Sequence, residues 1–423
     1  MPVPFVKCVF DKDDPRKSSR ELAPFLFPGY EPGDADLDLD VKALTQGTTN
    51  GLFMVTRSRR LSSPEAGATG AGSVLVKVYG EGTEITIDRN KELKVHELLS
   101  EMQLSSAPLV RFTNGHAYQF IPGNPCSEDG IAQAKIWRAV ARELARWHAM
   151  LPTVRSEDPQ QSFSYEPCIW STAKKWLDAI LSQPSRSMAS KEKLREEFEY
   201  LTKKLLFNGS APEPLVLGHG DLLCGNIIAQ NPIHGSAPSE VASVRFIDYE
   251  HATYCPRAFE LANHFAEWAG FQCNYNLLPT KATRRDFIRE YLEAYADFTR
   301  ARQPNAGANV NGDKRPITDA EIDELMHQVD AFRGFPGFYW GLCALIQAET
   351  STGSIDFDYS GYAEKRFAEY RAWRSVEEGK LNDHGELPLR EKRWAALYND
   401  PLLTLRSHDV MMMDEVHVCG SSA

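Results

Sequence analysis

The apolar residues change their spacing once along the chain, and this change constrains the fold more than any other feature of the sequence. Before Pro122 they form short runs typical of strands, with one stretch of helical spacing at 88–102. After Pro125 they recur every three or four residues, as in the stripes that begin at Trp137 and at Phe287. We therefore expect an α+β protein in which a small strand-rich lobe is followed by a larger, mostly helical lobe. The strand-like runs are 41–44, 52–56, 74–79, 109–114 and 116–121.

The segment Pro122-Gly123-Asn124-Pro125 breaks both patterns, and we expect the lobe boundary there. The predicted N-terminal lobe is 37–122 and the predicted C-terminal lobe is 123–408. Residues 1–36 are rich in Pro and Asp and show no sustained period, so they are predicted to be a loosely held arm, and 409–423 is a predicted tail. Three polar stretches are expected to be exposed insertions, namely 57–72, 230–242 and 301–316.

Composition excludes several classes of function. Lys and Arg total 47 against 58 Asp and Glu, and this net charge of −11 argues against nucleic acid as a partner. No apolar run approaches the ~18–20 residues of a membrane span, so no integral membrane segment is expected. The start of the chain lacks the apolar core of a signal peptide. The eight cysteines are scattered without a Cys-x-x-Cys pair, which favours reduced thiols and a cytoplasmic location.

His219, Asp221 and Asn226 carry the most informative pattern, His-x-Asp-x4-Asn. This is the spacing of the catalytic loop of kinases, where the Asp accepts the proton of the attacking hydroxyl and the Asn holds a metal ion. Apolar residues on both sides are expected to anchor the loop. For His219 itself we favour a structural role, because such a histidine more often bonds the backbone than acts as a base.

A second acidic site follows the apolar run Val244–Ile247. Asp248 stands where kinases have the Asp of Asp-Phe-Gly, which chelates Mg²⁺. Together Asn226 and Asp248 supply the amide and carboxylate oxygens that Mg²⁺ accepts beside substrate phosphates. The alternative, that Asp248 merely caps a turn, stays open at this point.

The N-terminal lobe offers residues for ATP in the order in which kinases carry them. A turn rich in Gly, Thr and Asn, at 47–51, is expected to lie over the phosphates. A lysine within a strand is expected to pair with a glutamate of the next helix, and backbone amides at the lobe junction are expected to face the adenine. Each feature is weak alone, but their shared order indicates an ATP-dependent phosphotransferase. The expected ATP contacts are Thr48, Thr49, Asn50, Lys77, Glu92, Gln119 and Ile121.

Over roughly residues 41–375 the chain resembles the choline/ethanolamine kinase family, and within it ethanolamine kinases most closely. The segments that carry the resemblance are Gly218–Ile228, Phe246–Glu250, Asn263–Gly270, Trp340–Ala348 and Phe357–Ala363. The run Asn-His-Phe-x-Glu-Trp at 263–268 is more specific to this family than the general phosphotransferase loop. The resemblance implies a protein-kinase-like fold and transfer of the γ-phosphate of ATP to the hydroxyl of ethanolamine. This reaction begins the ethanolamine branch of phospholipid synthesis.

The resemblance also implies roles for individual residues. Asp221 would be the catalytic base, with Asn226 and Asp248 as ligands of Mg²⁺. Glu250 would be a second acidic contact to metal or substrate, while Asn263 and Glu267 either face the substrate or belong to an internal polar network. Members of the family are often dimers, so a homodimer is an expected assembly. The expected substrate contacts are Glu250, Glu267, Trp340, Phe357 and Tyr362; Trp268, on an apolar helix face, is expected in the core.

Four positions depart from the family pattern. Lys77 replaces a frequent Arg, and His251, Gln272 and Cys343 stand where aromatic residues are usual. Aromatic faces hold a quaternary ammonium by cation–π attraction, whereas a primary ammonium has three donors that carboxylates and amides can accept. Fewer aromatic residues beside retained carboxylates therefore favour ethanolamine over choline. The alternatives are a choline or dual kinase, a phosphotransferase of the aminoglycoside type, and a pseudokinase without activity.

Overall fold

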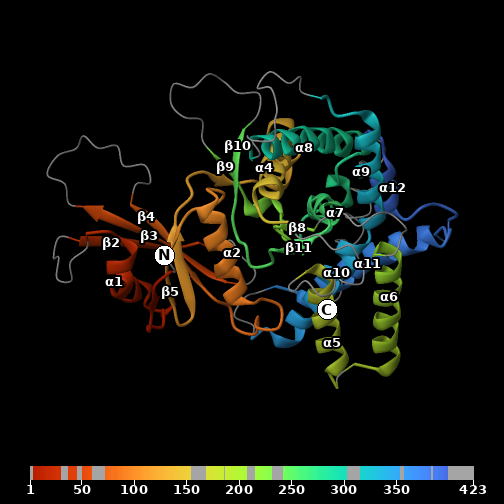
Figure 1. Cartoon of the computed structure of the whole chain (residues 1–423). Coiled ribbons are helices and arrows are strands. Elements are labelled where there is room, and N and C mark those ends of the chain that lie inside the picture. Colours follow the sequence, from red (N-terminus) through yellow and green to blue (C-terminus); the bar gives the residue numbers. More distant parts are fainter. Residues whose placement is uncertain are drawn as a thin grey trace, which may run out of the picture.

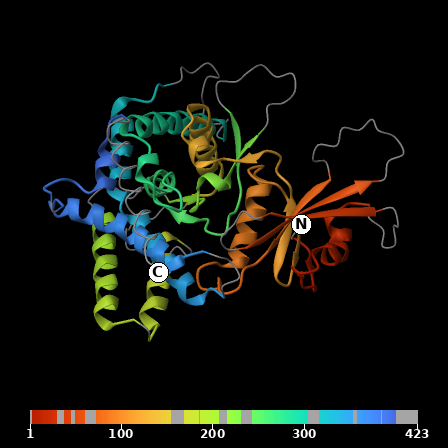
Figure 2. The ribbon, with the colours of Figure 1, turned by 180° about the vertical axis from the view of Figure 1, so that it is seen from behind.

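The computed structural model describes most of the chain and shows a sheet at one end and a helical body at the other (Figures 1 and 2). The strand-rich part precedes the helical part, which confirms the expected α+β order. Apart from their ends, the three predicted insertions lie outside the described residues, and so does the predicted tail at 409–423. The described residues are 3–29, 37–44, 50–59, 72–153, 168–184, 186–206, 215–230, 242–302, 315–352, 357–382 and 384–398.

The N-terminal sheet has six strands in the order β1-β5-β6-β4-β3-β2. All neighbouring strands are antiparallel except β1 and β5, which are parallel. Their bounds are β1 Phe5–Val6, β2 Leu37–Leu44, β3 Gly51–Arg59, β4 Ser73–Val78, β5 Pro108–Phe112 and β6 Gly115–Gln119. Two helices accompany the sheet, α1 Pro15–Leu26 and α2 Arg89–Glu101.

The alternation of side chains along β4 decides what each face of the sheet does. Val74, Val76 and Val78 are buried in an apolar cluster that includes residues of α1. Leu75 and Lys77, between them in the sequence, line a cavity on the opposite side. One strand therefore supplies both the core of the lobe and the lysine of the candidate site.

The prediction of a loosely held arm at 1–36 is wrong for residues 3–29. Phe5 and Val6 pair with residues 111 and 112 of β5, and α1 buries Leu22 and Leu26 completely or almost so, at 0% and 2% exposure. Asp14 caps α1 by accepting a hydrogen bond from Lys17 N (3.1 Å). The two-residue strand is too short to show a period, and its pairing partner lies more than 100 residues away.

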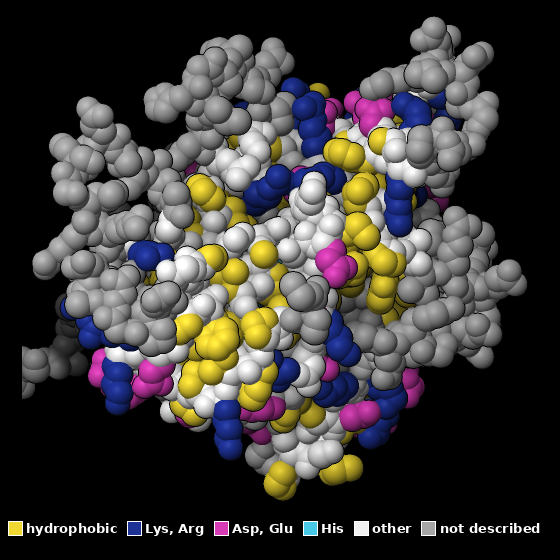
Figure 3. All heavy atoms as spheres, turned by 60° about the vertical axis from the view of Figure 1, so that its left-hand side comes forward, with side chains coloured by type: hydrophobic (Ala, Val, Ile, Leu, Met, Phe, Trp, Pro, Cys, Tyr) yellow, Lys and Arg dark blue, Asp and Glu magenta, His cyan; other side chains and the backbone are white. Residues whose placement is uncertain are grey.

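The helical body surrounds a large apolar cluster that contains the fully buried Trp147, Trp170 and Trp373. None of the described helices is long and apolar enough to cross a membrane. On the face drawn in Figure 3, Lys and Arg, Asp and Glu, and apolar side chains are interspersed. The main helices are α4 Ala134–Met150, α5 Ile169–Ser182, α6 Met188–Leu206, α7 Arg257–Glu267, α8 Lys281–Arg302, α9 Asp319–Phe332, α10 Phe335–Thr350, α11 Tyr359–Glu377 and α12 Leu389–Ala395, with a short α3 at Glu128–Ile131.

Two small sheets lie at the junction of the two lobes, and the loops that form the candidate site follow strands of these sheets. The predicted boundary after Pro122 falls between β6 and β7, and β7 pairs with β9 rather than with the N-terminal sheet. A second contact between the two parts is made by the loop 79–88, which docks on the C-terminal end of α10. There Thr350 Oγ1 donates to Gly82 O (2.7 Å) and Gln347 Nε2 donates to Thr86 Oγ1 (2.6 Å). The remaining strands are β7 Asn124–Pro125, β8 Val216–Gly218, β9 Ile227–Gln230, β10 Ser243–Phe246 and β11 Thr253–Cys255.

Candidate active site

The loop after β8 is held in place by one face of α7. The Glu260 carboxylate accepts hydrogen bonds from the backbone N–H groups of His219 (2.9 Å) and Gly220 (3.2 Å). One turn along the helix, Asn263 Nδ2 donates to Gly220 O at 2.8 Å, and His264 Nδ1 lies 2.8 Å from Leu222 O. Residues three and four apart share a helix face, so this spacing lets one helix bond successive residues of the loop. The loop is thereby fixed before any ligand binds.

His219 has the structural role that its sequence context favoured. Its Nε2 lies 2.9 Å from Ile247 O, and its Nδ1 accepts from Asp221 N at 3.3 Å. Burial lowers the pKa of His219 to about 4, so the imidazole is neutral at pH 7. Next to it Gly220 has φ +79°, and a Cβ there would lie only 2.4 Å from His251 O, which makes glycine necessary at this turn.

Asp221 projects from this fixed loop into a cavity. Asn226 Nδ2 donates to both Asp221 O (2.8 Å) and Asp221 Oδ2 (3.2 Å). The pKa of Asp221 is raised, first by burial and then by the nearby carboxylates of Glu267, Asp248 and Glu250. A carboxylate with a raised pKa is a better proton acceptor than a solvated one, which suits a general base.

Asp248 follows β10 in a left-handed backbone conformation, with φ +67°. Such a conformation is uncommon for a residue other than glycine and often marks a functional position. Burial and then Glu250 raise the pKa of Asp248 to about 6, against the opposing effect of Lys77. Its side chain remains 34% exposed, far more than the carboxylates around it, and it faces the cavity. A residue that only capped a turn would not need to face the cavity, so turn capping alone does not explain Asp248.

Lys77 lies at the centre of three carboxylates. Its Nζ is 2.6 Å from Glu92 Oε1, 2.7 Å from Asp248 Oδ1 and 2.8 Å from Glu250 Oε2. The expected Lys77–Glu92 pair is therefore present, and it joins β4 to α2. Because the lysine also contacts Asp248, it links the sheet to the loop that carries the acidic site.

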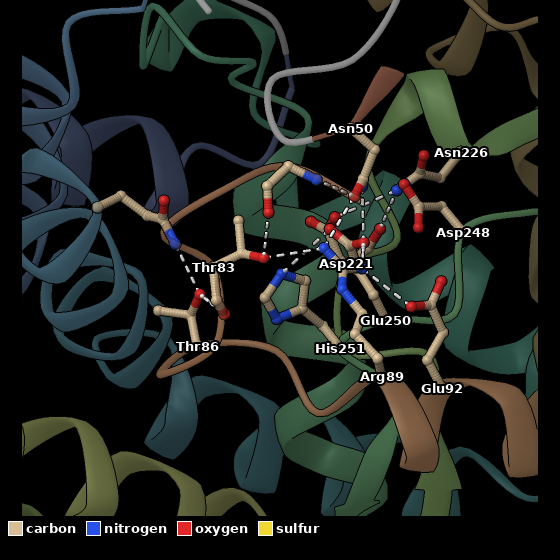
Figure 4. A network of polar contacts seen from close by, with 12 residues as sticks. Asn50, Thr83, Thr86, Arg89, Glu92, Asp221, Asn226, Asp248, Glu250 and His251 are labelled. Carbon is tan, nitrogen blue, oxygen red and sulfur yellow. Dashed lines mark hydrogen bonds and ion pairs between the residues drawn. The ribbon is translucent and has the colours of Figure 1, made fainter. Parts of the chain in front are cut away.

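Arg89 is the main site residue that the sequence did not single out. Its Nη1 bonds Glu92 Oε2 (2.9 Å) and Glu250 Oε2 (2.8 Å), and its Nη2 donates to Asn50 Oδ1 (2.8 Å) and Thr83 Oγ1 (3.0 Å) (Figure 4). The Arg89–Glu92 spacing of three residues at a helix start was an available signal, but Glu250 lies 161 positions away.

Two protein cations already pair with the three carboxylates of the acidic cluster in this site. Glu92, Asp248 and Glu250 lie close enough to hold a metal ion, yet Lys77 and Arg89 occupy the space among them. The amide nitrogen of Asn226 is turned to Asp221, so the amide oxygen of Asn226 is the atom that remains to bind a metal ion. Asn226 and Asp248 both line the cavity, and a carboxylate with an amide oxygen is a donor set that fits Mg²⁺.

The cavity has a volume of about 740 Å³ and is lined from both lobes. Apolar residues such as Leu52, Met54 and Ile121 form one end, and the other end holds Glu267 and Trp340. Asp221, Asn226 and Asp248 lie along the same cavity. The carboxylate of Asp221 therefore lines the same cavity as residues of both ends.

A profile of the family described as choline/ethanolamine kinase matches residues 41–371. The chain belongs to the choline/ethanolamine kinase family. Ethanolamine kinase 1 of Mus musculus is 31% identical to it over 365 residues, which cover 84% of this chain and 88% of the mouse protein. The ethanolamine kinase of Drosophila melanogaster is 33% identical over 314 residues, covering 72% of this chain and 54% of the fly protein.

Solved structures of two relatives share the fold of this family member. Ethanolamine kinase of Plasmodium vivax superposes with a TM-score of 0.62 at 22% identity and covers 86% of this chain and 91% of its own. Choline kinase of Cryptosporidium parvum gives a TM-score of 0.62 at 20% identity and covers 89% of this chain and 99% of its own. The expected protein-kinase-like bilobal fold is thus confirmed.

At the apolar end the expected ATP contacts have mixed outcomes. Asn50, Lys77 and Ile121 line the cavity, and Glu92 lies behind Lys77 as its partner. Gln119 does not line it, because its N–H donates to Ala107 O (3.1 Å) and its side chain is exposed. The C-terminal end of β6 uses this amide for the sheet, and a contact of Gln119 with ATP stays a prediction. Thr48 and Thr49 lie outside the described residues.

At the other end Glu267, Trp340, Phe357 and Tyr362 all line the cavity. Asn263 does not, since it is fully buried and accepts from Trp340 Nε1 (2.9 Å), so it belongs to an internal polar network. Glu250 lines the cavity but is only 3% exposed, with its Oε2 bonded by Lys77, Arg89 and Asn50.

Trp268, 3% exposed, lies in the core as expected. Thr86 and Gln347 also line the cavity, and no pattern in the sequence predicts their pairing.

Proposed function

We propose that this member of the family is an ethanolamine kinase, which transfers the γ-phosphate of ATP to the hydroxyl of ethanolamine and releases phosphoethanolamine and ADP. The observation that carries the proposal is that one cavity holds the base Asp221, the Lys77–Asp248 pair and the carboxylate of Glu267. These are the groups that a phosphoryl transfer to an amino alcohol requires. The relatives from mouse and fly bear the name ethanolamine kinase.

In the proposed reaction Asp221 orients the acceptor hydroxyl and takes its proton late, because the transition state of phosphoryl transfer is loose. Asn226 fixes the Asp221 carboxylate from one side, so little reorganisation is needed during the step. Lys77 neutralises phosphate charge at the apolar end. Asn226 and Asp248 would hold Mg²⁺, which supplies charge neutralisation at the β- and γ-phosphates when bound.

The acceptor end favours a small cation. Burial raises the pKa of Asp221, and the carboxylates of Glu267, Asp248 and Glu250 raise it further, so a substrate ammonium beside Asp221 would relieve that repulsion. Burial lowers the pKa of His251 to about 4, so this ring is neutral at pH 7 and does not repel a cation. A primary ammonium can donate three hydrogen bonds to such groups.

Choline is the second candidate, and one observation favours it. Phe271, Phe357 and Tyr362 stand around the acceptor end with ring centroids 5.5–5.7 Å apart, as aromatic residues that hold a quaternary ammonium would. We favour ethanolamine because His251 and Cys343, which stand where the family usually carries aromatic residues, also line the cavity. A cytoplasmic location fits the seven described cysteines, none of which forms a disulfide. The expected homodimer stays a prediction.

The proposal is tested by ADP release from Mg·ATP with ethanolamine, its N-methylated forms and choline. We expect turnover with ethanolamine to exceed turnover with choline, and Asp221→Asn to abolish turnover while ATP binding survives. Preference for choline would replace the substrate and keep the kinase. ATP binding without ADP release for every amino alcohol would indicate a pseudokinase, and normal turnover in Asp221→Asn would refute the assigned base.

A further inference from the structure

Glu267 is the carboxylate that defines the acceptor end of the cavity, and it has little contact with water. Its exposed fraction is 4%, and it stands at the C-terminal end of α7. Burial raises the pKa of Glu267, whereas Arg366 acts in the opposite direction. A buried carboxylate that must bind an ammonium needs a fixed direction and a retained charge. A neighbouring group has to provide this direction and keep the carboxylate charged.

Arg366 of α11 is the group that contacts the Glu267 carboxylate, and it does not itself line the cavity. It is fully buried, and its Nη2 lies 3.1 Å from Glu267 Oε1. Its Nε lies 3.3 Å from Glu369 Oε2, and its Cζ is 5.9 Å from the centre of the Tyr362 ring. Glu267 and Tyr362 both line the cavity, whereas Arg366 does not. The arginine therefore touches two cavity residues without reaching the ligand space itself.

The helices around Arg366 leave it little freedom. Tyr362, Arg366 and Glu369 share one face of α11 by their spacing of four and three residues. That face packs on α10 so closely that a Cβ on Gly337 would lie 2.6 Å from Arg366 O. The position of the guanidinium is thus set by the packing of α11 on α10, and through the guanidinium so is the position of Glu267.

Stability alone does not account for this arrangement. A buried ion pair is often no more stable than apolar residues of similar volume. In addition, Arg366 Nε and Nη1 are buried and have no hydrogen-bond partner among the described residues, although Nε forms an ion pair with Glu369, and this is a cost to the fold. A fold that needed only a filled space here would be better served by an apolar side chain. The cation does something that an apolar side chain cannot.

We propose that Arg366 is a positioning residue that holds Glu267 as a carboxylate directed at the ammonium of the acceptor, with Glu369 as its second anchor. This role rests on the proposed function. Removing the cation would leave Glu267 and Glu369 with uncompensated buried charge. Glu267 would then turn away or take up a proton, and the acceptor would lose a charge-assisted hydrogen bond. Nucleotide binding at the other end of the cavity would be untouched.

The test compares Arg366→Met with a matched control, Arg284→Met. Arg284 is just as buried, at 1% exposure, but it donates to the backbone oxygens of Pro279 and Trp394, and none of these residues lines the cavity. We expect Arg366→Met to raise the KM for ethanolamine about 10- to 100-fold, the range for losing a hydrogen bond to a charged group, with the KM for ATP unchanged. Arg284→Met should lower thermal stability without changing either KM.

Two further variants keep the test decisive if Arg366→Met does not fold. Arg366→Lys retains the charge and should recover most of the affinity for ethanolamine. Glu369→Gln removes only the second anchor, so it should raise the KM for ethanolamine less than Arg366→Met does. An unchanged KM for ethanolamine in Arg366→Met, or in Glu369→Gln if Arg366→Met does not fold, would overturn the positioning role, and so would an equal rise in the KM for ATP or the same rise in Arg284→Met. A wild-type protein inactive on every amino alcohol would instead overturn the proposed function, and the positioning role with it.

Discussion

The docking of loop 79–88 on α10 leads to a prediction about Gly82. This glycine has φ +75°, and a Cβ there would lie 2.1 Å from the carbonyl oxygen of Thr350. Gly82→Ala therefore has to move the loop away from α10. The movement would break the hydrogen bonds Thr350–Gly82 and Gln347–Thr86, which join the two lobes. Loss of this contact should also disturb Arg89, because Thr83 of the same loop binds its guanidinium.

The size of the effect follows from two contributions. A non-glycine residue in the left-handed region costs about 1–2 kcal/mol. Each of the two broken hydrogen bonds contributes about 1 kcal/mol. Gly82→Ala should therefore lower the free energy of unfolding by about 3–4 kcal/mol. Gly379 is the matched control, because its φ is +69° but a Cβ there would meet no atom within 4 Å. Gly379→Ala should lose only the conformational part, about 1–2 kcal/mol.

Urea unfolding followed by tryptophan fluorescence measures both free energies, and ADP release measures the KM for ATP. We expect Gly82→Ala to be about 2 kcal/mol less stable than Gly379→Ala, the part due to the broken contacts, and to have a raised KM for ATP. Equal stability of the two variants, with equal KM values for ATP, would refute the reasoning, since it would mean that the loop does not hold the lobes together.

Two other predictions concern buried charge. Lys77→Met leaves Glu92, Asp248 and Glu250 without their shared cation and should lower the free energy of unfolding by about 3–5 kcal/mol, far more than Asp221→Asn; equal urea midpoints for the two variants would contradict this. Acid should unfold the protein, because burial lowers the pKa values of His96 and His148 to about 3 and of His219 and His264 to about 4. An unfolded chain binds these protons at its ordinary pKa, so stability is complete above pH 6.5 and falls as the pH drops toward 4, by about 2 kcal/mol for each histidine at pH 5. Burial raises the pKa values of Asp221, Asp248, Glu260 and Glu267 and so acts in the opposite direction, but these are four carboxyl groups against six histidines, because burial also lowers the pKa values of His116 and His251. Circular dichroism across pH 7 to 4 measures the transition, and undiminished stability at pH 4 would contradict this prediction.

The parts of the site that the sequence predicted are those held by local spacing. His219, Asp221 and Asn226 lie on one loop, and Lys77 and Glu92 lie on consecutive elements, so their arrangement follows from order along the chain. The contacts that escaped prediction join distant segments. Asn50 binds Glu250 across 200 positions, and Gln347 binds Thr86 across 261. Such pairings cannot be predicted from periodicity or residue propensity, because they form only when the two lobes pack together.

The pairing of β1 with β5 bears on how the chain is made in the cell. The N-terminal segment leaves the ribosome first, yet its partners at residues 111 and 112 must be synthesised before β1 can join the sheet. At ordinary elongation rates this takes roughly 5 to 20 s. During that interval the apolar face of α1, with Leu22 and Leu26, lacks the part of its cluster that β5 and β6 supply, namely Val110, Phe112 and Ala117. The nascent chain therefore presents a chaperone-binding surface early in its synthesis, and completion of the sheet removes that surface.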